Sequence, residues 1–418
     1  MKKGIEYHQQ IRRFIMLNVK TPDEVLAIIE KEIGPLKQTE RVDILASSGR
    51  ILAEDVCSSE YVPGFNRSSV DGYAIRAKDS FGCTESIPAI LKLTAEIEMG
   101  KEFTEELPRG CCASVPTGGK VPDGADGVVM IEYTEKFSKD EVAIIKPIAP
   151  GENLVYKGDD CKPGQIIAKA GTAVKAQHVG VFASLGIKTV PVAKKITAGI
   201  ISTGDELVDI DETPNDGQVR DVNSYMLAAL CKESGCEVIN YGFCKDEEET
   251  LRGLVKRALS ECDLVLISGG SSVGQKDATA RIIEGYGPLL FHGIAMKPGK
   301  PTILGKCGKK PIIGLPGHPG ASFFVSTLFV KPLISKLTGN VDRDWPVPAK
   351  ISEAIPANQG RTVYIGVQLE YEGDTLYATP VQSKSGLVSS LAVSDGFVCV
   401  PRDCEGYPKG AEVKAYIF

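Results

Sequence analysis

Small hydroxyl residues and glycines follow a short apolar run near the middle of the chain. The run Leu264–Ile267 is unbroken, which is typical of a strand buried on both faces of a parallel sheet. The loop after it includes Ser268, Gly269, Gly270, Ser271 and Gly274. At the carboxyl end of a strand, such a loop presents backbone N–H groups to an anion. Asp277 closes the loop, and its carboxylate could bind a metal ion or cap the next helix.

This loop is not a nucleoside-triphosphate P-loop. Gln275 occupies the position of the P-loop lysine, and no Ser or Thr follows Lys276. Taken alone, the loop is equally well explained as a tight turn between a strand and a helix, with no ligand. The other strand ends must therefore decide whether a site is present.

Polar loops also follow four neighbouring strands that the sequence predicts. One loop contains Glu206 and the next contains Asp246. The remaining two loops contain Lys297, Lys300 and Pro301, and Pro316 and Pro319, respectively. Each loop alone could be a cap or a turn, but strand-end loops of a parallel sheet share one edge. Carboxylates, lysines and glycine amides on one edge indicate an anionic substrate bound together with Mg²⁺.

The elements that position these loops alternate between Lys194 and about Gly339. Apolar runs predict strands at 196–201, 237–242, 264–267, 289–294 and 312–315. Helical periodicity predicts helices at 224–233, 247–260, 278–284 and 321–337. The alternation predicts a central three-layer α/β/α domain with a parallel sheet, spanning residues 194–339.

Three further regions flank this predicted domain. Short alternating strands with turn signals predict an inserted small β domain at 61–149. Residues 1–60 and 150–193 are expected to form one mixed N-terminal domain, which the chain leaves and re-enters. After a Pro-rich linker around Trp345, residues 340–418 alternate and turn repeatedly, which predicts a C-terminal β-barrel-like domain. The predicted fold class is therefore multidomain α/β plus β.

The amino-acid composition argues against several classes of binding partner. The 418 residues carry a net charge of -6 without a basic block, which argues against nucleic acid or an anionic membrane surface. Twelve cysteines lack metal-site spacing and only four histidines are present, so zinc is not expected. The longest largely apolar stretch, Ala321–Val330, is too short to span a bilayer. We expect a cytoplasmic protein with reduced thiols.

Six sequence motifs resemble those of the MoeA family, the molybdopterin molybdenumtransferases related to the E domain of gephyrin. Two of them, Arg67–Ala74 and Pro116-Thr117-Gly118, lie in the predicted β domain. The others lie in the predicted α/β domain, whose fold is similar to that of MogA, and span residues 202–207, 268–277, 297–301 and 314–319. The resemblance covers nearly the whole chain in the family's order.

The resemblance implies an enzyme of molybdenum cofactor biosynthesis. Such enzymes insert molybdate, as a substrate, into adenylylated molybdopterin, with Mg²⁺-dependent release of AMP. By motif match, the functional positions are Asp71, Thr117, Glu206, Asp246, Asp277, Pro316 and Pro319. Asp277 and Glu206 are expected to bind Mg²⁺, the amides of residues 268–274 to bind phosphate or AMP, and the two lysines to bind molybdate.

The resemblance also implies a homodimer whose site lies between subunits, with Asp71 and Thr117 facing the partner chain. The upstream adenylyltransferase and apo-molybdoenzymes are further expected partners. Some positions depart from the family pattern: Gly293 replaces a frequent lysine, Ile365-Gly366 replaces Arg-Gly, and the loop hydroxyl moves from position 321 to Ser322. Ser385 retains the small hydroxyl loop of the last domain.

Two alternative functions remain open from the sequence. A MogA-type adenylyltransferase shares the Ser-Gly-Gly and Asp pattern, although the additional domains and the Arg67–Tyr73 loop argue against it. A non-enzymatic scaffold of the gephyrin type is the other alternative. The carboxylates and lysines favour catalysis, because a scaffold need not keep them.

Overall fold

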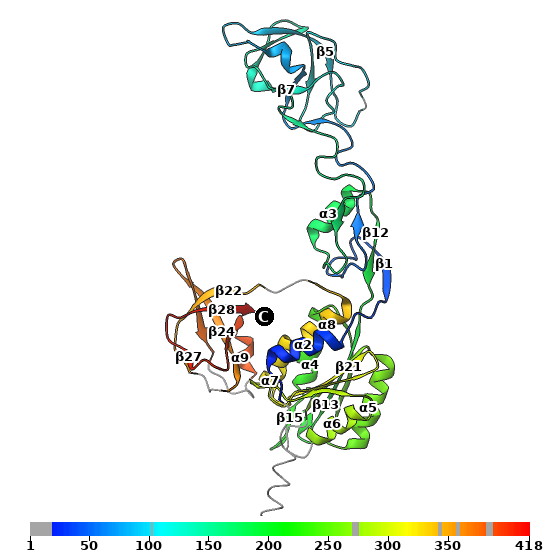
Figure 1. Ribbon diagram of the computed structural model, residues 1–418, viewed down its shortest axis with the longest axis vertical. Coiled ribbons are helices and arrows are strands. Elements are labelled where there is room, and N and C mark those ends of the chain that lie inside the picture. Colours follow the sequence, from blue (N-terminus) through cyan, green and yellow to red (C-terminus); the bar gives the residue numbers. More distant parts are fainter. Residues whose placement is uncertain (1–18, 102, 270–275, 342–344, 357–359, 382–387) are drawn as a thin grey trace, which may run out of the picture.

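The computed structural model describes residues 19–101, 103–269, 276–341, 345–356, 360–381 and 388–418. The molecule is elongated, with one β-sheet at its far end, a small mixed region in the middle, and an α/β sheet beside a β-barrel at the other end (Figure 1). This arrangement confirms a multidomain chain with sheets and a closed barrel. The domain boundaries given above remain predictions.

The α/β sheet has the strand order β16-β13-β17-β21-β20-β18. Its strands are β13 (Thr197–Thr203), β16 (Glu237–Cys244), β17 (Leu264–Gly269), β18 (Leu289–His292), β20 (Ile303–Cys307) and β21 (Lys310–Leu315). The neighbours β16, β13, β17 and β21 are parallel, as predicted. The expectation of a wholly parallel sheet was wrong, because β20 lies antiparallel between β18 and β21. Cys307 pairs with Lys310 across the two-residue turn Gly308-Lys309, a short hairpin that the sequence analysis missed.

Helices pack against this sheet through two separate apolar clusters. They are α2 (Pro22–Glu32), α4 (Asn223–Glu233), α5 (Glu248–Glu261), α6 (Lys276–Glu284), α7 (Pro319–Val325), the π-helical segment η3 (Ser326–Val330) and α8 (Lys331–Thr338). Ile200 belongs to a cluster with α2, α4 and α8, whereas its neighbour Ile201 belongs to a cluster with α5 and α6. Successive side chains of a strand point to opposite faces, so both faces of the sheet are covered.

The helix from α7 through η3 to α8 is longer than the apolar stretch noted in the sequence. Within the described residues, Pro319–Thr338 is the one helix whose length and composition would allow it to cross a membrane. However, 61% of its most apolar window is buried inside the structure. Val325, Phe329 and Leu333 lie in the core cluster beside the sheet, so internal packing accounts for the apolar composition.

The middle of the molecule is built from paired segments far apart in the sequence. Strand β1 (Thr39–Asp43) pairs with β12 (Thr189–Ala193), β2 (Val56–Cys57) with β11 (Ile166–Ala168), and β3 (Arg67–Ser68) with β10 (Leu154–Val155). Helix α3 (Ala176–Ser184) buries Phe182 against this region. The chain therefore leaves and re-enters this region along neighbouring strands.

The far sheet has the strand order β7-β4-β6-β5-β9-β8. Its strands are β4 (Gly72–Ile75), β5 (Ala89–Glu96), β6 (Cys111–Val115), β7 (Gly127–Met130), β8 (Thr134–Lys136) and β9 (Glu141–Ile144). All neighbours are antiparallel except β5 and β6. Alternating side chains form two apolar clusters, around Ile75 and around Ala74.

The C-terminal strands close into a barrel. They are β22 (Val347–Ile351), β24 (Thr362–Glu372), β25 (Thr375–Pro380), β26 (Gly396–Val400) and β28 (Glu412–Ile417). Pairing between β24 and β26 closes the ring. Strand β19 (Met296–Lys297), which belongs in sequence to the α/β region, pairs with β24. This pairing joins the lysine loop directly to the barrel.

Candidate functional site

The five strand ends of the α/β sheet separate into two groups. Gly269 at the end of β17 and the loops after β18 and β21 border one large cavity. Loops after β13 and β16 instead contact each other through their carboxylates. The common edge predicted from the sequence therefore holds two neighbouring sets of residues.

The cavity lies between the α/β sheet and the barrel and has a volume of about 860 Å³. The α/β side contributes Gly269, Met296–Pro301 and residues of the 316–321 loop. The barrel side contributes Arg361 and Val363–Gly366, among others. The cavity brings together Gly269, Lys297, Lys300, Pro301 and Pro316 from the predicted set.

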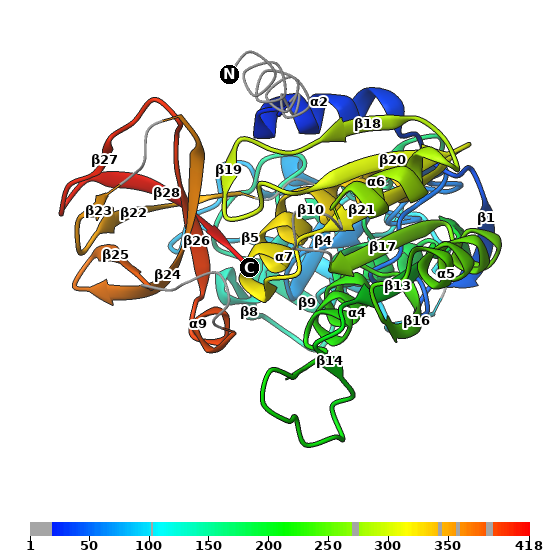
Figure 2. The same ribbon diagram turned by 90° about the horizontal axis from the view of Figure 1, so that it is seen from below.

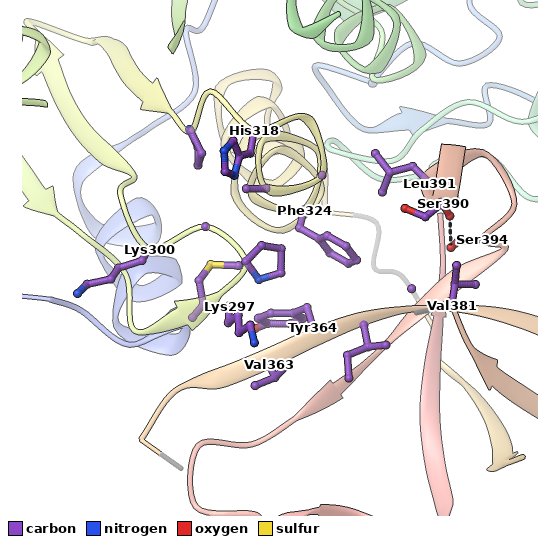
Figure 3. Close-up of a pocket in the computed structure, with 18 of the residues that line it drawn as sticks. Lys297, Lys300, His318, Phe324, Val363, Tyr364, Val381, Ser390, Leu391 and Ser394 are labelled. Carbon is purple, nitrogen blue, oxygen red and sulfur yellow. Dashed lines mark hydrogen bonds between the residues drawn. The ribbon is translucent and has the colours of Figure 1, made fainter. Parts of the chain in front are cut away.

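Lys297 and Lys300 supply positive charge to one wall of the cavity. Both side chains are exposed, and they lie on the loop whose first residues pair with β24. In Figure 3 the Lys297 side chain lies near Tyr364, whereas that of Lys300 points away from the other labelled residues. Lys297 is therefore the lysine better placed to reach a ligand inside the cavity.

An aromatic cluster joins the α/β side of the cavity to its barrel side. Phe324 of α7 makes edge-to-face contact with Phe397 of the barrel, with ring centroids 5.9 Å apart, and Tyr364 contacts the same Phe397 ring at 5.9 Å. Burial raises the pKa of the Tyr364 hydroxyl above its usual value. Val363, Val381 and Leu391 also line the cavity and add apolar surface to it (Figure 3). The cavity can thus accept a ligand with both an anionic group and an apolar ring.

Glycine at two positions is required by the backbone of this region. Gly269 has φ +138°, and a Cβ there would lie 2.0 Å from the Thr203 carbonyl oxygen, so only glycine allows the ends of β13 and β17 to approach. Gly293 has φ +98°, a conformation that a lysine at this position would rarely adopt. The positive φ of the backbone therefore explains why position 293 has glycine instead of the lysine that is frequent in the family.

The second group of loops gathers carboxylates. The Thr203 hydroxyl donates to Asp246 Oδ1 at 2.7 Å, and the Asp246 N–H donates to Asp205 Oδ1 at 3.2 Å. Glu206 follows directly and is exposed. The excursion between β14 (Leu207–Val208) and β15 (Val219–Arg220) projects from the sheet just beyond it (Figure 2).

These oxygens suit a hard cation such as Mg²⁺. Among the residues that the structure describes, no cluster of three or more His, Cys, Asp or Glu side chains forms a complete metal site. Mg²⁺ sites commonly use one or two protein carboxylates together with substrate phosphates. Asp246 and Glu206 fit that incomplete kind of site.

Asn223, which was not predicted, joins the ends of β17 and β21 within the first group. Its Nδ2 donates to the Ser268 hydroxyl at 2.8 Å and to the Gly317 carbonyl at 2.8 Å. The buried Asp221 accepts hydrogen bonds from the Ser202 and Ser224 hydroxyls. Ser268, predicted to bind substrate, is buried and serves here as the acceptor of the Asn223 amide. The polar residues Asp221, Asn223 and Ser224 around the start of helix α4 were the available sequence signal.

Asp71 and Thr117 lie in the far β-sheet region, at the other end of the molecule from the cavity (Figure 1). Thr117 donates to Asp71 Oδ1 from its N–H at 2.6 Å and from its hydroxyl at 2.9 Å. These bonds from Thr117 hold the pKa of the Asp71 carboxyl below its usual value. The structure brings the two residues together but does not bring them to the cavity of the same chain.

The remaining predicted residues have different locations. Gly270, Ser271, Gly274 and Ser385 lie outside the described residues. Asp277 is the second residue of α6, and Pro319 is the first residue of α7. Ser322 is fully buried and does not line the cavity, which its neighbour Ala321 does.

The barrel residues of the cavity were largely missed from the sequence. Val363, Tyr364 and Val381 contribute to the wall, but their alternation only indicated a strand. Arg361, the nearest arginine to the departure at 365, also lines the cavity. Which face of a terminal domain contacts the α/β domain has no local signal in the sequence.

Comparison with known proteins gives matches over nearly the whole chain. Family models match the MoeA N-terminal region (domain I and II) at 20–186, a probable molybdopterin binding domain at 199–336, and the MoeA C-terminal region (domain IV) at 348–418. The chain is 32% identical to the molybdopterin molybdenumtransferase of Bacillus subtilis over 410 residues, covering 96% of this chain and 95% of that protein. It is 33% identical to the molybdopterin molybdenumtransferase of Haemophilus influenzae, covering 78% and 79%.

A solved structure gives the same result. The crystal structure of the molybdopterin biosynthesis moeA protein from Pyrococcus horikoshii OT3 superposes with a TM-score of 0.85 at 34% identity. The match covers 96% of this chain and 100% of that chain. The similarity therefore includes the whole architecture rather than one domain.

Proposed function

The chain belongs to the MoeA family, and we propose that it is a molybdopterin molybdenumtransferase that inserts molybdate into adenylylated molybdopterin and releases AMP. The observation that carries this proposal is the cavity between the α/β sheet and the barrel, which combines Lys297 and Lys300 with an apolar, aromatic wall. A tetrahedral dianion needs charge and hydrogen-bond donors, whereas a pterin ring needs a flat apolar surface. The names of the relatives support the same reaction.

Residues of this chain would divide the work as follows. Lys297, with Lys300, would bind molybdate as compact point charges. The amides at the end of β17 and the start of α7 would bind the phosphate portion of the substrate. Asp246, Glu206 and Asp277 would hold Mg²⁺, which when bound would neutralise negative charge on the phosphates.

We further propose that the working unit is a homodimer with the site shared between subunits. Asp71 and Thr117 form a preorganised pair at the far end of the molecule from the described α/β loops of their own chain (Figure 1). A second chain arranged with two-fold symmetry could supply that counterpart. The cytoplasmic location and the partnership with an upstream adenylyltransferase and apo-molybdoenzymes remain predictions.

Incubation of the purified chain with adenylylated molybdopterin, molybdate and Mg²⁺ tests the proposal. We expect release of AMP and appearance of molybdenum bound to the pterin, both dependent on molybdate. Formation of adenylylated molybdopterin from molybdopterin and ATP would instead identify an adenylyltransferase. Absence of both reactions would favour a scaffold.

A further inference from the structure

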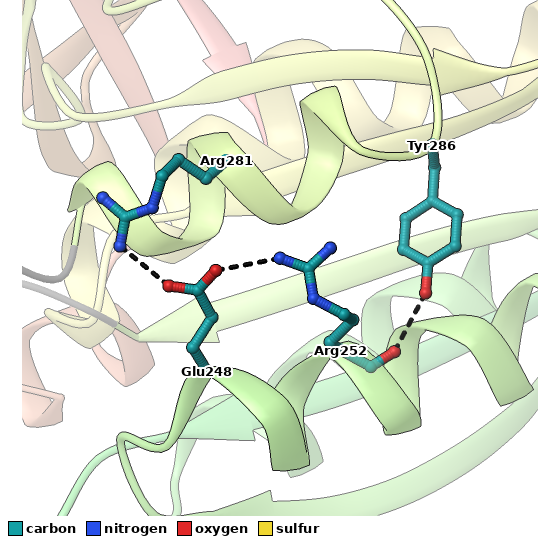
Figure 4. Close-up of polar contacts among 4 residues, drawn as sticks. All are labelled: Glu248, Arg252, Arg281 and Tyr286. Carbon is teal, nitrogen blue, oxygen red and sulfur yellow. Dashed lines mark hydrogen bonds and ion pairs between the residues drawn. The ribbon is translucent and has the colours of Figure 1, made fainter.

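Glu248 binds two arginines that come from different helices. Its Oε1 accepts from Arg252 of the same helix α5 at 2.8 Å, and its Oε2 accepts from Arg281 of helix α6 at 2.8 Å (Figure 4). Hydrogen bonds from Arg281 and then Arg252 hold the pKa of the Glu248 carboxyl below its usual value. Both oxygens are therefore occupied, and the carboxylate stays ionised at neutral pH.

A second contact ties the other end of α6 to α5. The Tyr286 hydroxyl, which follows α6, donates to the Arg252 carbonyl oxygen at 3.1 Å. The Arg252 guanidinium also packs against Gly285, where a Cβ would lie 3.0 Å from its NH1 nitrogen. Together with the Glu248–Arg281 pair, these contacts fix the position of α6 along α5.

Glu248 and Arg281 are close in sequence to two residues of the proposed site. Glu248 begins α5 two residues after Asp246, and Arg281 lies one helical turn after Asp277 on α6. Both helices begin at the edge of the sheet where the strands β16 and β17 end. A shift of α6 along α5 would therefore change the separation of the two segments that carry these carboxylates.

We propose that Glu248 is a positioning residue: by binding Arg281 it fixes the separation between the Asp246 loop and the first turn of α6. This role rests on the proposed function, in which Asp246 and Asp277 act together. Glu248 and Arg281 need not touch the substrate. Ion pairs this exposed contribute little to stability, so losing one should change Tm little and leave the folded chain intact.

The opposite end of α5 provides a matched control. Glu261 also uses both oxygens, accepting from Arg257 Nε at 3.0 Å and from the Tyr241 hydroxyl at 2.7 Å. It lies at the last residue of α5, away from the proposed site. Glu261→Gln therefore removes a comparable charge and comparable contacts without touching the start of α6.

The test compares Glu248→Gln, Arg281→Gln, their double variant and Glu261→Gln in the full-length chain. We expect Glu248→Gln to lower kcat for AMP release roughly tenfold or more and to raise the half-saturating Mg²⁺ concentration, with the KM for the pterin substrate within about twofold. The double variant should be no worse than either single variant. Glu261→Gln should keep wild-type kinetics, with a Tm change similar to that of Glu248→Gln.

Amide hydrogen exchange supplies a readout independent of activity. Exchange over Lys276–Glu284 should be faster in Glu248→Gln than in Glu261→Gln. If Glu248→Gln matches Glu261→Gln in kinetics and exchange, the pair is only structural and the inference is wrong. Loss of kcat in Arg281→Gln alone would show that Arg281 itself contacts substrate, which also overturns it. A wild-type chain that releases no AMP would instead refute the proposed function, and the positioning role with it.

Discussion

The cavity and the Asp71–Thr117 pair are assembled in different ways. The cavity needs two parts of one chain, because its walls come from the α/β loops and from the barrel strands β24 and β25. The Asp71–Thr117 pair is complete within one small sheet, where a single carboxylate oxygen already accepts two hydrogen bonds. One region is thus built by packing between domains, and the other by two segments of one small β-sheet region that lie 46 residues apart in the sequence.

The difference concerns what each region still lacks. The cavity offers cations and an apolar wall, and carboxylates lie nearby at the ends of β13 and β16. The Asp71–Thr117 pair offers one ordered carboxylate on an exposed surface at the other end of the chain (Figure 1). If both regions serve one reaction, a second copy of the chain must bring them together.

The largest expected effect on AMP release comes from variants that each inactivate one of the two regions. Asp71→Ala and Asp277→Ala should each lower AMP release by about a hundredfold or more, because each removes a carboxylate from the proposed site. Mixing the two variants should restore activity, since a heterodimer contains one site with both carboxylates intact. With random exchange, recovery should approach about a quarter of the wild-type rate.

The control for this experiment is the mixture of each variant with itself under the same exchange conditions. Chain exchange is followed separately by mass-tagged subunits. Exchange without recovery would mean that the two regions do not share a site across subunits. The idea that the cavity comes from one chain and the Asp71–Thr117 pair from the other would then be wrong.

The two lysines of the cavity loop should differ in importance. Lys297→Met should raise half-saturating molybdate by about ten- to a hundredfold, the effect of losing one charge-assisted contact worth about 1.5–3 kcal/mol. Lys300→Met should have a smaller effect, because its side chain points away from the other cavity residues (Figure 3). Steady-state AMP release against molybdate concentration measures both.

Binding of the adenylylated pterin is the internal control for the lysine variants. Its affinity should change little in either variant, since methionine keeps most of the stem and deletes only the charge. A reversed order, with Lys300→Met the more damaging, would mean that the loop rearranges when substrate binds. Weakened pterin binding with unchanged molybdate dependence would place the oxyanion elsewhere.

From the sequence, we could predict the positions of those residues that follow directly from the order of strands and helices. The apolar run Leu264–Ile267 became β17, and the loops carrying Glu206, Asp246, Lys297 and Pro316 lie at the ends of strands, as the alternation indicated. The hairpin strand β20 was missed, because a two-residue turn between Cys307 and Lys310 is a weak signal. Local periodicity was sufficient for the frame of the α/β domain.

The division of that edge into two groups could not be predicted. The barrel docks over the ends of β17, β18 and β21 and leaves those of β13 and β16 outside the cavity. Docking depends on contacts between distant residues, such as Phe324 with Phe397, and neither residue carries a local sign of its partner. The distance from Asp71 to the cavity is likewise set by the paired segments of the middle region.

The smallest expected effect separates Ser322 from its neighbour Ala321. The Ser322 hydroxyl is buried and has no hydrogen-bond partner among the described residues, whereas Ala321 lines the cavity. Ser322→Ala should therefore leave half-saturating molybdate within about twofold and keep or slightly raise Tm, because an unsatisfied buried hydroxyl costs about 1–3 kcal/mol.

Ala321→Ser tests the same geometry from the other side. It introduces a hydroxyl in the first turn of α7, at a residue that lines the same cavity as the lysine loop, so it should lower half-saturating molybdate severalfold. The decisive measurement is molybdate dependence in both variants, with Tm as the check on folding. If Ser322→Ala raised the molybdate requirement tenfold while Ala321→Ser had no effect, α7 would have to rotate on binding. The cavity would then have to rearrange before it binds substrate, so it would not be preassembled in the free chain. The contrast with the Asp71–Thr117 pair would disappear.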